Sequence, residues 1–338
     1  MAIKATKPEI KKQERVIQAE AKESDSSITL RPKDLNWYVW QETIKKHLSV
    51  SIASAKIRKE PLEHILFYWP PGLWKTTISN IIAHEMWANI KTTSGPAIEK
   101  QSDLVSILSN LEDGDILFID EIHRLRSQVE EILYTAMEDN NIDIMVGKGT
   151  GAQSVRLPVK SFTLVWATTK LSSLSAPLRD RFGNILKLDF YNDSELEIIL
   201  RNNAHIIGVE LNDNCVEKIA KKSRGTPRVA NRLLKILRDY HTIGKDINTS
   251  ETLSEIFKSI GIDELGLDYL DSKILEVIYY KFLGWPVGLN TIAAAVWEEE
   301  STIEEVVEPY LLQMWFLERT PRGRKITEKA TVHLLSKK

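Results

Sequence analysis

One nine-residue segment limits the possible folds of this chain more than any other. Trp69–Thr77 (W-P-P-G-L-W-K-T-T) follows the apolar run Ile65–Tyr68 and precedes a helical stretch. With glycine in place of both tryptophans, it would be the phosphate-binding loop G-x-x-x-x-G-K-T between a strand and a helix. Such a loop needs glycine because its backbone N–H groups must wrap closely around the phosphates. In a working loop Lys75 would reach the β- and γ-phosphates and the Thr76 hydroxyl would bind Mg²⁺, whereas two tryptophans would severely impair nucleotide binding.

Hydrophobic periodicity predicts an α/β protein with a parallel sheet. Short apolar runs at Ile65–Tyr68, Ile116–Ile119 and Phe162–Val165 alternate with amphipathic stretches, which is typical of buried parallel strands. We therefore expect a flexible tail over 1–28, an α/β domain over 29–190 with a hairpin near 143–158, a helical domain over 191–264 and a winged-helix module over 265–338.

Composition and charge restrict the partners and the location. The 338 residues carry a formal net charge of −2, so any surface for nucleic acid must be local. Seven Lys or Arg and only one acid lie in residues 319–338, which favours phosphate contact there. A single cysteine, Cys215, excludes an internal disulfide and a multi-cysteine zinc site and fits a reducing compartment. Lacking a membrane-spanning run or a secretory signal, the chain is expected in the cytoplasm with no membrane partner.

Polar residues follow two further apolar runs. Asp120-Glu121 comes directly after Ile116–Ile119, where Asp120 can hold Mg²⁺ and Glu121 can polarise an attacking water. Thr169 ends the next strand, where it is placed to sense a γ-phosphate. Arg181 and Arg228 offer guanidinium groups that stabilise a transferring phosphoryl group, although each alone could equally form a surface ion pair.

Several longer segments carry a family resemblance. They are Leu30–Lys33, Thr93–Lys100, Leu117–Arg124, Ala136–Asp139, Pro177–Gly183, Gly225–Arg228 and Arg319–Arg324. Over about residues 29–335 the chain resembles the RuvB family of bacterial Holliday-junction branch-migration motors, which are hexameric AAA+ ATPases. The resemblance implies a large AAA+ domain, a helical lid and a C-terminal winged-helix domain.

The resemblance also implies roles for individual residues. Lys75 and Thr76 would belong to the Walker A motif, Asp120 and Glu121 to Walker B, and Thr169 would be the first sensor. Arg181 would reach the ATP of a neighbouring subunit and Arg228 would be the second sensor. Further positions match residues that line the nucleotide: Leu30, Arg31, Gly72, Thr77, Glu138, Asp139, Asn140 and Tyr191. Asn140 departs from the family, which often has an aromatic or apolar residue there.

Two more regions match the contacts that the family makes with its partners. Arg319 and Arg324 correspond to DNA-contacting arginines. The hairpin strand with Val155 and Leu157 resembles the element that docks on the junction-binding protein RuvA. The expected partners are therefore double-stranded DNA at Holliday junctions, RuvA, further copies of this chain in a ring, and RuvC as an additional candidate.

The tryptophans depart systematically from the family pattern. Eight of the nine fall where the family has glycine: Trp40, Trp69, Trp74, Trp87, Trp166, Trp285, Trp297 and Trp315; Trp37 is ambiguous. The 15 glycines and nine tryptophans together reach the roughly 7% glycine that is usual for a protein. Some bacterial lineages read the codon UGA as glycine and others read it as tryptophan. We therefore hypothesise that the cell makes glycine at most or all of the nine positions.

Two alternatives remain open. If Trp69 and Trp74 are real, the chain would be a DNA-binding scaffold that has lost ATP. Another AAA+ DNA machine, such as a clamp-loader subunit, would share Lys75 and Asp120, but it would not predict the hairpin or the R-T-P-R-G-R turn at 319–324.

Overall fold

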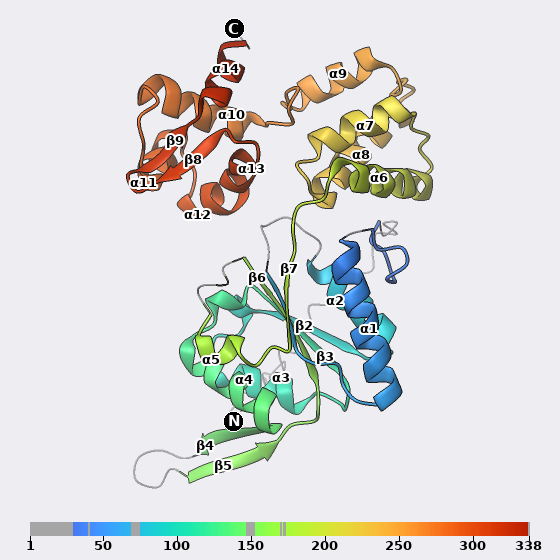
Figure 1. Ribbon diagram of the computed structural model, residues 1–338, viewed down its shortest axis with the longest axis vertical. Helices are drawn as coiled ribbons and strands as arrows, with labels where there is room; N and C mark the ends of the chain where they lie inside the picture. Colours follow the sequence, from blue (N-terminus) through green and yellow to red (C-terminus); the bar gives the residue numbers. More distant parts are fainter. Residues whose placement is uncertain are drawn as a thin grey trace, which may run out of the picture.

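The structure is a computed structural model that describes residues 30–39, 41–68, 75–146, 153–169, 171 and 174–336. The expected tail over 1–28, Gly72 of the phosphate-binding loop and the turn of the hairpin lie outside these residues. The chain forms a sheet domain, a helical domain and a C-terminal domain (Figure 1).

A five-stranded parallel sheet is the centre of the first domain. Its strand order is β2-β3-β6-β1-β7, and every neighbouring pair is parallel. The strands are β1 (Ile65–Tyr68), β2 (Ile90–Ser94), β3 (Ile116–Asp120), β6 (Thr163–Thr168) and β7 (Asn184–Lys187). The central strands β1, β3 and β6 are almost completely buried. The predicted α/β fold is confirmed.

Alternating side chains of the central strands fill two separate cores. In β1, Ile65 and Phe67 belong to one core, whereas Leu66 belongs to the other. Helices α1 (Glu42–Arg58) and α2 (Lys75–Met86) cover the first face of the sheet. The second face is covered by α3 (Gln101–Ser109), α4 (Ser127–Asp139) and α5 (Ala176–Arg179) (Figure 1).

A two-stranded hairpin projects from the second face (Figure 1). It consists of β4 (Asn141–Val146) and β5 (Gln153–Pro158), which pair antiparallel. Leu157 packs against the core at the base of the hairpin, and Val155, two residues farther out, is 38% exposed.

Four helices form the second domain: α6 (Asp193–Ile207), α7 (Asp213–Lys222), α8 (Pro227–Thr242) and α9 (Ser250–Ser259). Each begins after an Asn or Thr whose side chain accepts a hydrogen bond from the backbone of the first turn. Their apolar faces continue the core of the α1–α2 face of the sheet. The helical domain and the α1–α2 face of the sheet therefore share one continuous core.

The third domain has its own core and a two-stranded wing. Its helices are α10 (Tyr269–Glu276), α11 (Leu289–Val296), α12 (Glu300–Thr302), α13 (Glu308–Gln313) and α14 (Glu328–Ser336), and its strands are β8 (Leu317–Thr320) and β9 (Gly323–Ile326). This is the predicted winged-helix fold. Helix α14 was not predicted, because its sequence is mostly polar and places only Ala330 and Leu334 in the core. Within the described ranges, no helix is long and apolar enough to cross a membrane.

Candidate nucleotide and DNA sites

The carboxyl ends of three neighbouring strands bring the predicted nucleotide residues to one edge of the sheet. Strand β6 lies between β3 and β1, so Thr168 is beside Tyr68 and Trp166 is beside Ile119. Asp120 ends β3, one residue beyond that pair. The chain passes from β1 through 69–74 into α2, which begins at Lys75. Ligands of open parallel sheets bind at this edge.

A close backbone contact fixes the carboxylate pair. The Glu121 backbone N–H donates to Asp120 Oδ1 at 2.9 Å, and Glu121 has a left-handed φ of 51°. A Cβ at Gly95 would lie 2.4 Å from the Glu121 carbonyl oxygen, so only glycine fits there. The Glu121 side chain is 40% exposed and lies 3.7 Å from Arg124. The strained turn thus presents Glu121 at the edge with its carboxylate still accessible.

Thr169 carries an unsatisfied polar group. Its hydroxyl oxygen is buried and has no hydrogen-bond partner among the described residues. A buried hydroxyl without a partner costs about 1–3 kcal/mol, so such a group suggests a ligand. A phosphate oxygen would supply the missing partner, and the residues at this edge therefore fit a nucleotide.

The first turn of α2 presents two threonines. Thr76 is half-buried, and its carbonyl oxygen accepts hydrogen bonds from Ser79 Oγ at 3.0 Å and Asn80 Nδ2 at 2.7 Å. Thr77 is buried beneath it. Lys75 begins the helix, but its side chain lies outside what the structure describes, as does Gly72.

Arg181 lies on the opposite face of the sheet from α2. Its guanidinium donates to the Tyr134 hydroxyl at 2.7 Å, lies 2.5 Å from a Glu138 carboxylate oxygen and stacks 4.7 Å from the Tyr134 ring centre. Asp139 and Asn140 end the same helix, α4, and Asn140 has the left-handed backbone that Asn tolerates. Four predicted nucleotide residues therefore gather away from the Lys75 edge. Tyr134 was not predicted from the sequence, because no motif distinguishes it.

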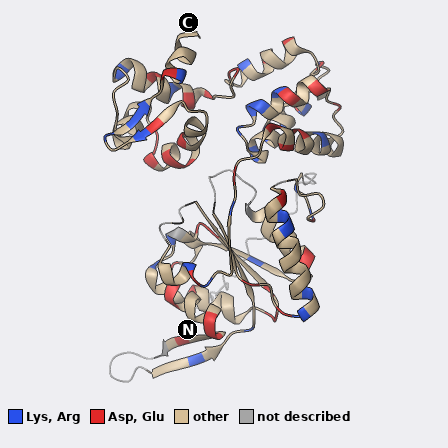
Figure 2. Cartoon of the chain, viewed as in Figure 1, with Lys and Arg blue, Asp and Glu red and all other residues tan. Residues whose placement is uncertain are grey.

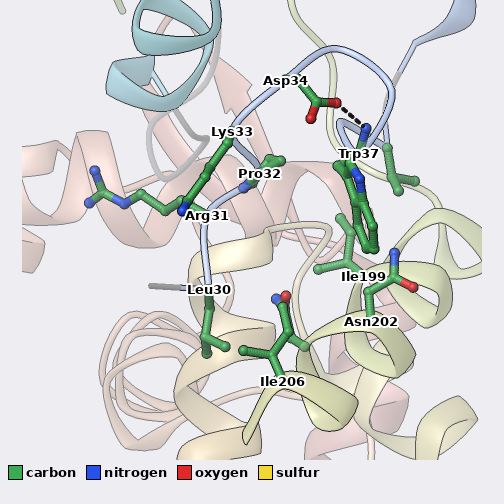
Figure 3. A pocket seen from close by; sticks show the side chains of 11 residues that line it. Leu30, Arg31, Pro32, Lys33, Asp34, Trp37, Ile199, Asn202 and Ile206 are labelled. Atoms are coloured by element: carbon green, nitrogen blue, oxygen red, sulfur yellow. Dashed lines mark hydrogen bonds between the residues drawn. The ribbon is translucent and has the colours of Figure 1, made fainter. Parts of the chain in front are cut away.

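Leu30 and Arg31 border a pocket of about 330 Å³ between the N-terminal segment and α6 (Figure 3). Asp34 shapes this segment by accepting hydrogen bonds from the backbone N–H groups of Asn36 and Trp37. Further lining residues are Pro32, Ile199, Asn202 and Ile206. The pocket joins the start of the described chain to the helical domain.

Tyr191 and Arg228 lie where the sheet domain meets the helical domain. Tyr191 is buried, its N–H donates to the Gly225 carbonyl at 2.9 Å, and burial raises the pKa of its phenol. Arg228 is exposed in the first turn of α8 and borders a second pocket with Arg224 and Tyr310 of α13. The second pocket therefore links the predicted nucleotide sensor to the winged-helix domain.

Arg224, which the sequence analysis did not select, is central to this junction. Its guanidinium contacts the buried carboxylate of Asp271, lies 2.9 Å from Asp268 and stacks 5.0 Å from the Tyr310 ring centre. Burial nevertheless raises the pKa of Asp271 to about 7.

Arg319 and Arg324 face one another across the wing. Both guanidinium groups bind the fully buried carboxylate of Glu308, and this hydrogen bond raises the pKa of Arg319. Figure 2 shows basic positions on the wing strands as well as across the other domains. Glu308 was not predicted from the sequence, because it follows exposed acids such as Glu299 and Glu300 and its burial has no signature in the sequence.

The parallel sheet, its polar edge and the adjoining helical domain define the chain as an AAA+ P-loop ATPase. The family model described as the Holliday junction DNA helicase RuvB P-loop domain matches residues 30–188. The RuvB AAA lid domain matches 191–263 and the RuvB C-terminal winged helix domain matches 264–335. The chain belongs to the RuvB family.

Individual relatives agree over almost the whole chain. The Holliday junction branch migration complex subunit RuvB of Dehalococcoides mccartyi is 54% identical over 324 residues, covering 95% of this chain and 93% of the relative. The Staphylococcus aureus protein of the same name is 52% identical, covering 93% and 94%. A structure of the Thermotoga maritima RuvB Holliday junction branch migration motor has a TM-score of 0.82 at 48% identity, covering 90% of this chain and 98% of that chain.

Proposed function

We propose that this chain is the ATP-driven motor subunit that moves Holliday junctions along DNA. The observation that carries the proposal is the carboxyl edge of the sheet. There, Asp120, Glu121 and the Thr169 hydroxyl, which has no partner among the described residues, lie at the same edge as the start of α2, in a chain that also has the family's lid and winged-helix domains.

The residues at the edge divide the chemistry among them. Lys75 and the backbone of the loop would bind the phosphates of ATP, and Glu121 would take a proton from the attacking water. Thr169 would donate a hydrogen bond to the γ-phosphate. Thr76 and Asp120 would hold Mg²⁺, which neutralises charge on the β- and γ-phosphates when it is bound.

A ring arrangement accounts for the residues on the far face of the sheet. Arg181, Glu138, Asp139 and Asn140 gather on the face opposite α2, so they are well placed to serve the nucleotide of a neighbouring copy. Six copies would close the ring, as the family resemblance implies. Hydrolysis would then shift the lid against the sheet domain through their shared core.

The remaining surfaces would meet DNA and protein partners. Arg319 and Arg324 on the wing would contact DNA phosphates. The exposed end of the hairpin with Val155 would dock on RuvA, and RuvC is a further candidate partner. Because all of these partners act on chromosomal DNA, we place the protein in the bacterial cytoplasm.

We further propose that the cell makes glycine at most of the tryptophan positions. Trp87, Trp297 and Trp315 have left-handed φ values of 54°, 62° and 57°, although they are 86%, 91% and 70% exposed. Each of these tryptophans follows a helix. The backbone N–H of the residue after the tryptophan donates to the carbonyl oxygen five positions earlier, as Phe316 does to Leu311 at 2.8 Å. Gly208 ends α6 in the same way with φ 72°. Glycine is the residue that this helix ending favours.

Trp166 adds a different argument for glycine. Its side chain is completely buried, and its indole N–H has no partner in the described part of the chain. A buried Trp N–H ordinarily finds an acceptor.

Steady-state hydrolysis of Mg-ATP tests the proposed function. We expect the full chain with glycine at positions 69 and 74 to hydrolyse ATP and the chain with both tryptophans to be inactive. In the glycine form, Thr169→Val keeps the side-chain shape but removes the hydroxyl, so we expect at least a roughly tenfold loss of hydrolysis with an unchanged fold. DNA binding without ATP binding in both forms would instead establish the scaffold alternative.

A further inference from the structure

The two wing arginines form an unusually tight cluster around one carboxylate. Arg319 on β8 and Arg324 on β9 are directly opposite one another, and like charges in that arrangement repel. Between them lies Glu308, the first residue of α13, whose side chain is 0% exposed. A buried carboxylate requires compensation, and both arginines provide it.

All four hydrogen bonds in the cluster have good geometry. Glu308 Oε1 accepts from Arg319 Nε and Arg324 Nε, both at 2.9 Å. Glu308 Oε2 accepts from Arg319 Nη2 at 2.8 Å and Arg324 Nη2 at 3.1 Å. Each carboxylate oxygen therefore bridges both guanidinium planes, and this fixes the position of one arginine relative to the other.

The backbone of the wing is fixed as well. Arg324 exchanges two backbone hydrogen bonds with Val287, at 2.7 and 2.8 Å. Gly323 has φ 126°, and a Cβ there would lie 2.3 Å from the Val287 carbonyl oxygen. The wing is thus held to the domain by its main chain and by Glu308.

The cluster keeps donors for a ligand. Each guanidinium has five N–H groups and uses two of them on Glu308. The Arg319 side chain is 51% exposed and that of Arg324 is 18% exposed. The remaining N–H groups therefore belong to side chains that Glu308 already holds in place. Binding a phosphate then costs less side-chain entropy.

We propose that Glu308 is a positioning residue that holds Arg319 and Arg324 in one fixed arrangement for a phosphate of the DNA backbone. This inference rests on the proposed DNA role of the two arginines. It opposes the simple electrostatic expectation that a negative charge beside the two arginines only weakens DNA binding.

The two views predict opposite signs for Glu308→Gln. Removing the charge should strengthen DNA binding if Glu308 is merely a counterion. If Glu308 is a positioning residue, the Gln NH₂ group faces one N–H of each guanidinium, so each arginine loses one of its two hydrogen bonds and both are loosened. We then expect the affinity for a DNA duplex to fall about tenfold. The slope of log K against log salt concentration should also become shallower by about one, the amount expected for the loss of one phosphate contact.

Fluorescence anisotropy with the full chain and a labelled duplex, over a series of salt concentrations, measures both quantities. Glu318→Gln is the matched control, because it removes the same charge at an exposed position of β8. The affinity of this variant for the duplex should stay equal or rise slightly. Glu308→Asp keeps the charge but shortens the side chain by one methylene, so it should weaken binding as well. Circular dichroism, and the hydrolysis of ATP without DNA by the form with glycine at positions 69 and 74, should stay at parental values.

The outcomes separate this inference from the proposed function. Unchanged or tighter binding by Glu308→Gln, with Arg319→Ala and Arg324→Ala both weakened, would overturn the positioning role and leave the DNA site standing. Unchanged binding by both arginine variants would remove the DNA role itself. In an Arg319→Ala background, Glu308→Gln should cost much less than it does alone, because one of its two ligands is already gone.

Discussion

At the scale of single residues, backbone conformation separates the tryptophans into two kinds. Trp87, Trp297 and Trp315 adopt a left-handed φ at helix ends, where a bulky side chain is strained. Trp285 is also exposed, at 69%, but its φ is not left-handed. The three helix-end positions favour glycine for a physical reason that does not depend on any relative.

Replacing tryptophan by glycine should therefore stabilise the protein at the three helix ends and destabilise it at position 285. We expect Trp87→Gly, Trp297→Gly and Trp315→Gly each to raise the free energy of unfolding by about 1 kcal/mol, since glycine relieves the left-handed strain. Trp285→Gly should lower it by about 0.5–1 kcal/mol, since glycine only adds freedom to the unfolded chain. The urea concentration at the unfolding midpoint, compared at constant m-value, measures the change in stability for all four variants. Equal destabilisation by the four changes would contradict this explanation.

At the scale of elements, the central strands could be predicted and the edge elements could not. Burial on both faces makes β1, β3 and β6 continuous apolar runs, and such runs are visible in a sequence. Strand β2 (I-K-T-T-S) lies at an edge and is only partly buried, so no run marks it. Glu308 and Tyr134 escaped prediction for a related reason, because their importance arises from contacts with residues distant in the sequence.

The two apolar residues of hairpin strand β5 have different predicted roles. Val155 and Leu157 share one face of β5, but Leu157 packs on the core while Val155 lies farther out. Val155→Glu should weaken binding to RuvA at least about tenfold with unchanged thermal stability, as expected of an interface anchor. Leu157→Glu should lower the melting temperature too, because it buries a charge. Calorimetric titration and thermal melts measure the two effects, and full RuvA binding by Val155→Glu would exclude this docking surface.

At the scale of the whole molecule, the arrangement of Arg181 and Lys75 on opposite faces predicts a shared active site. In the form with glycine at positions 69 and 74, Lys75→Ala and Arg181→Ala should each abolish hydrolysis alone, because the proposed site would take Lys75 from one copy and Arg181 from the next. Mixed in equal amounts, they should regain activity at about one interface in four. Activity of the mixture no higher than that of either variant would show that Arg181 does not act on a neighbour.

Branch migration itself tests the proposed motor function most directly. A synthetic four-way junction with RuvA and the full chain, carrying glycine at positions 69 and 74, should separate into its duplex products only when ATP and Mg²⁺ are present. Lys75→Ala in the same protein should bind the junction but leave it intact. Junction binding without ATP-dependent movement in the unsubstituted glycine form would contradict the motor and favour the scaffold.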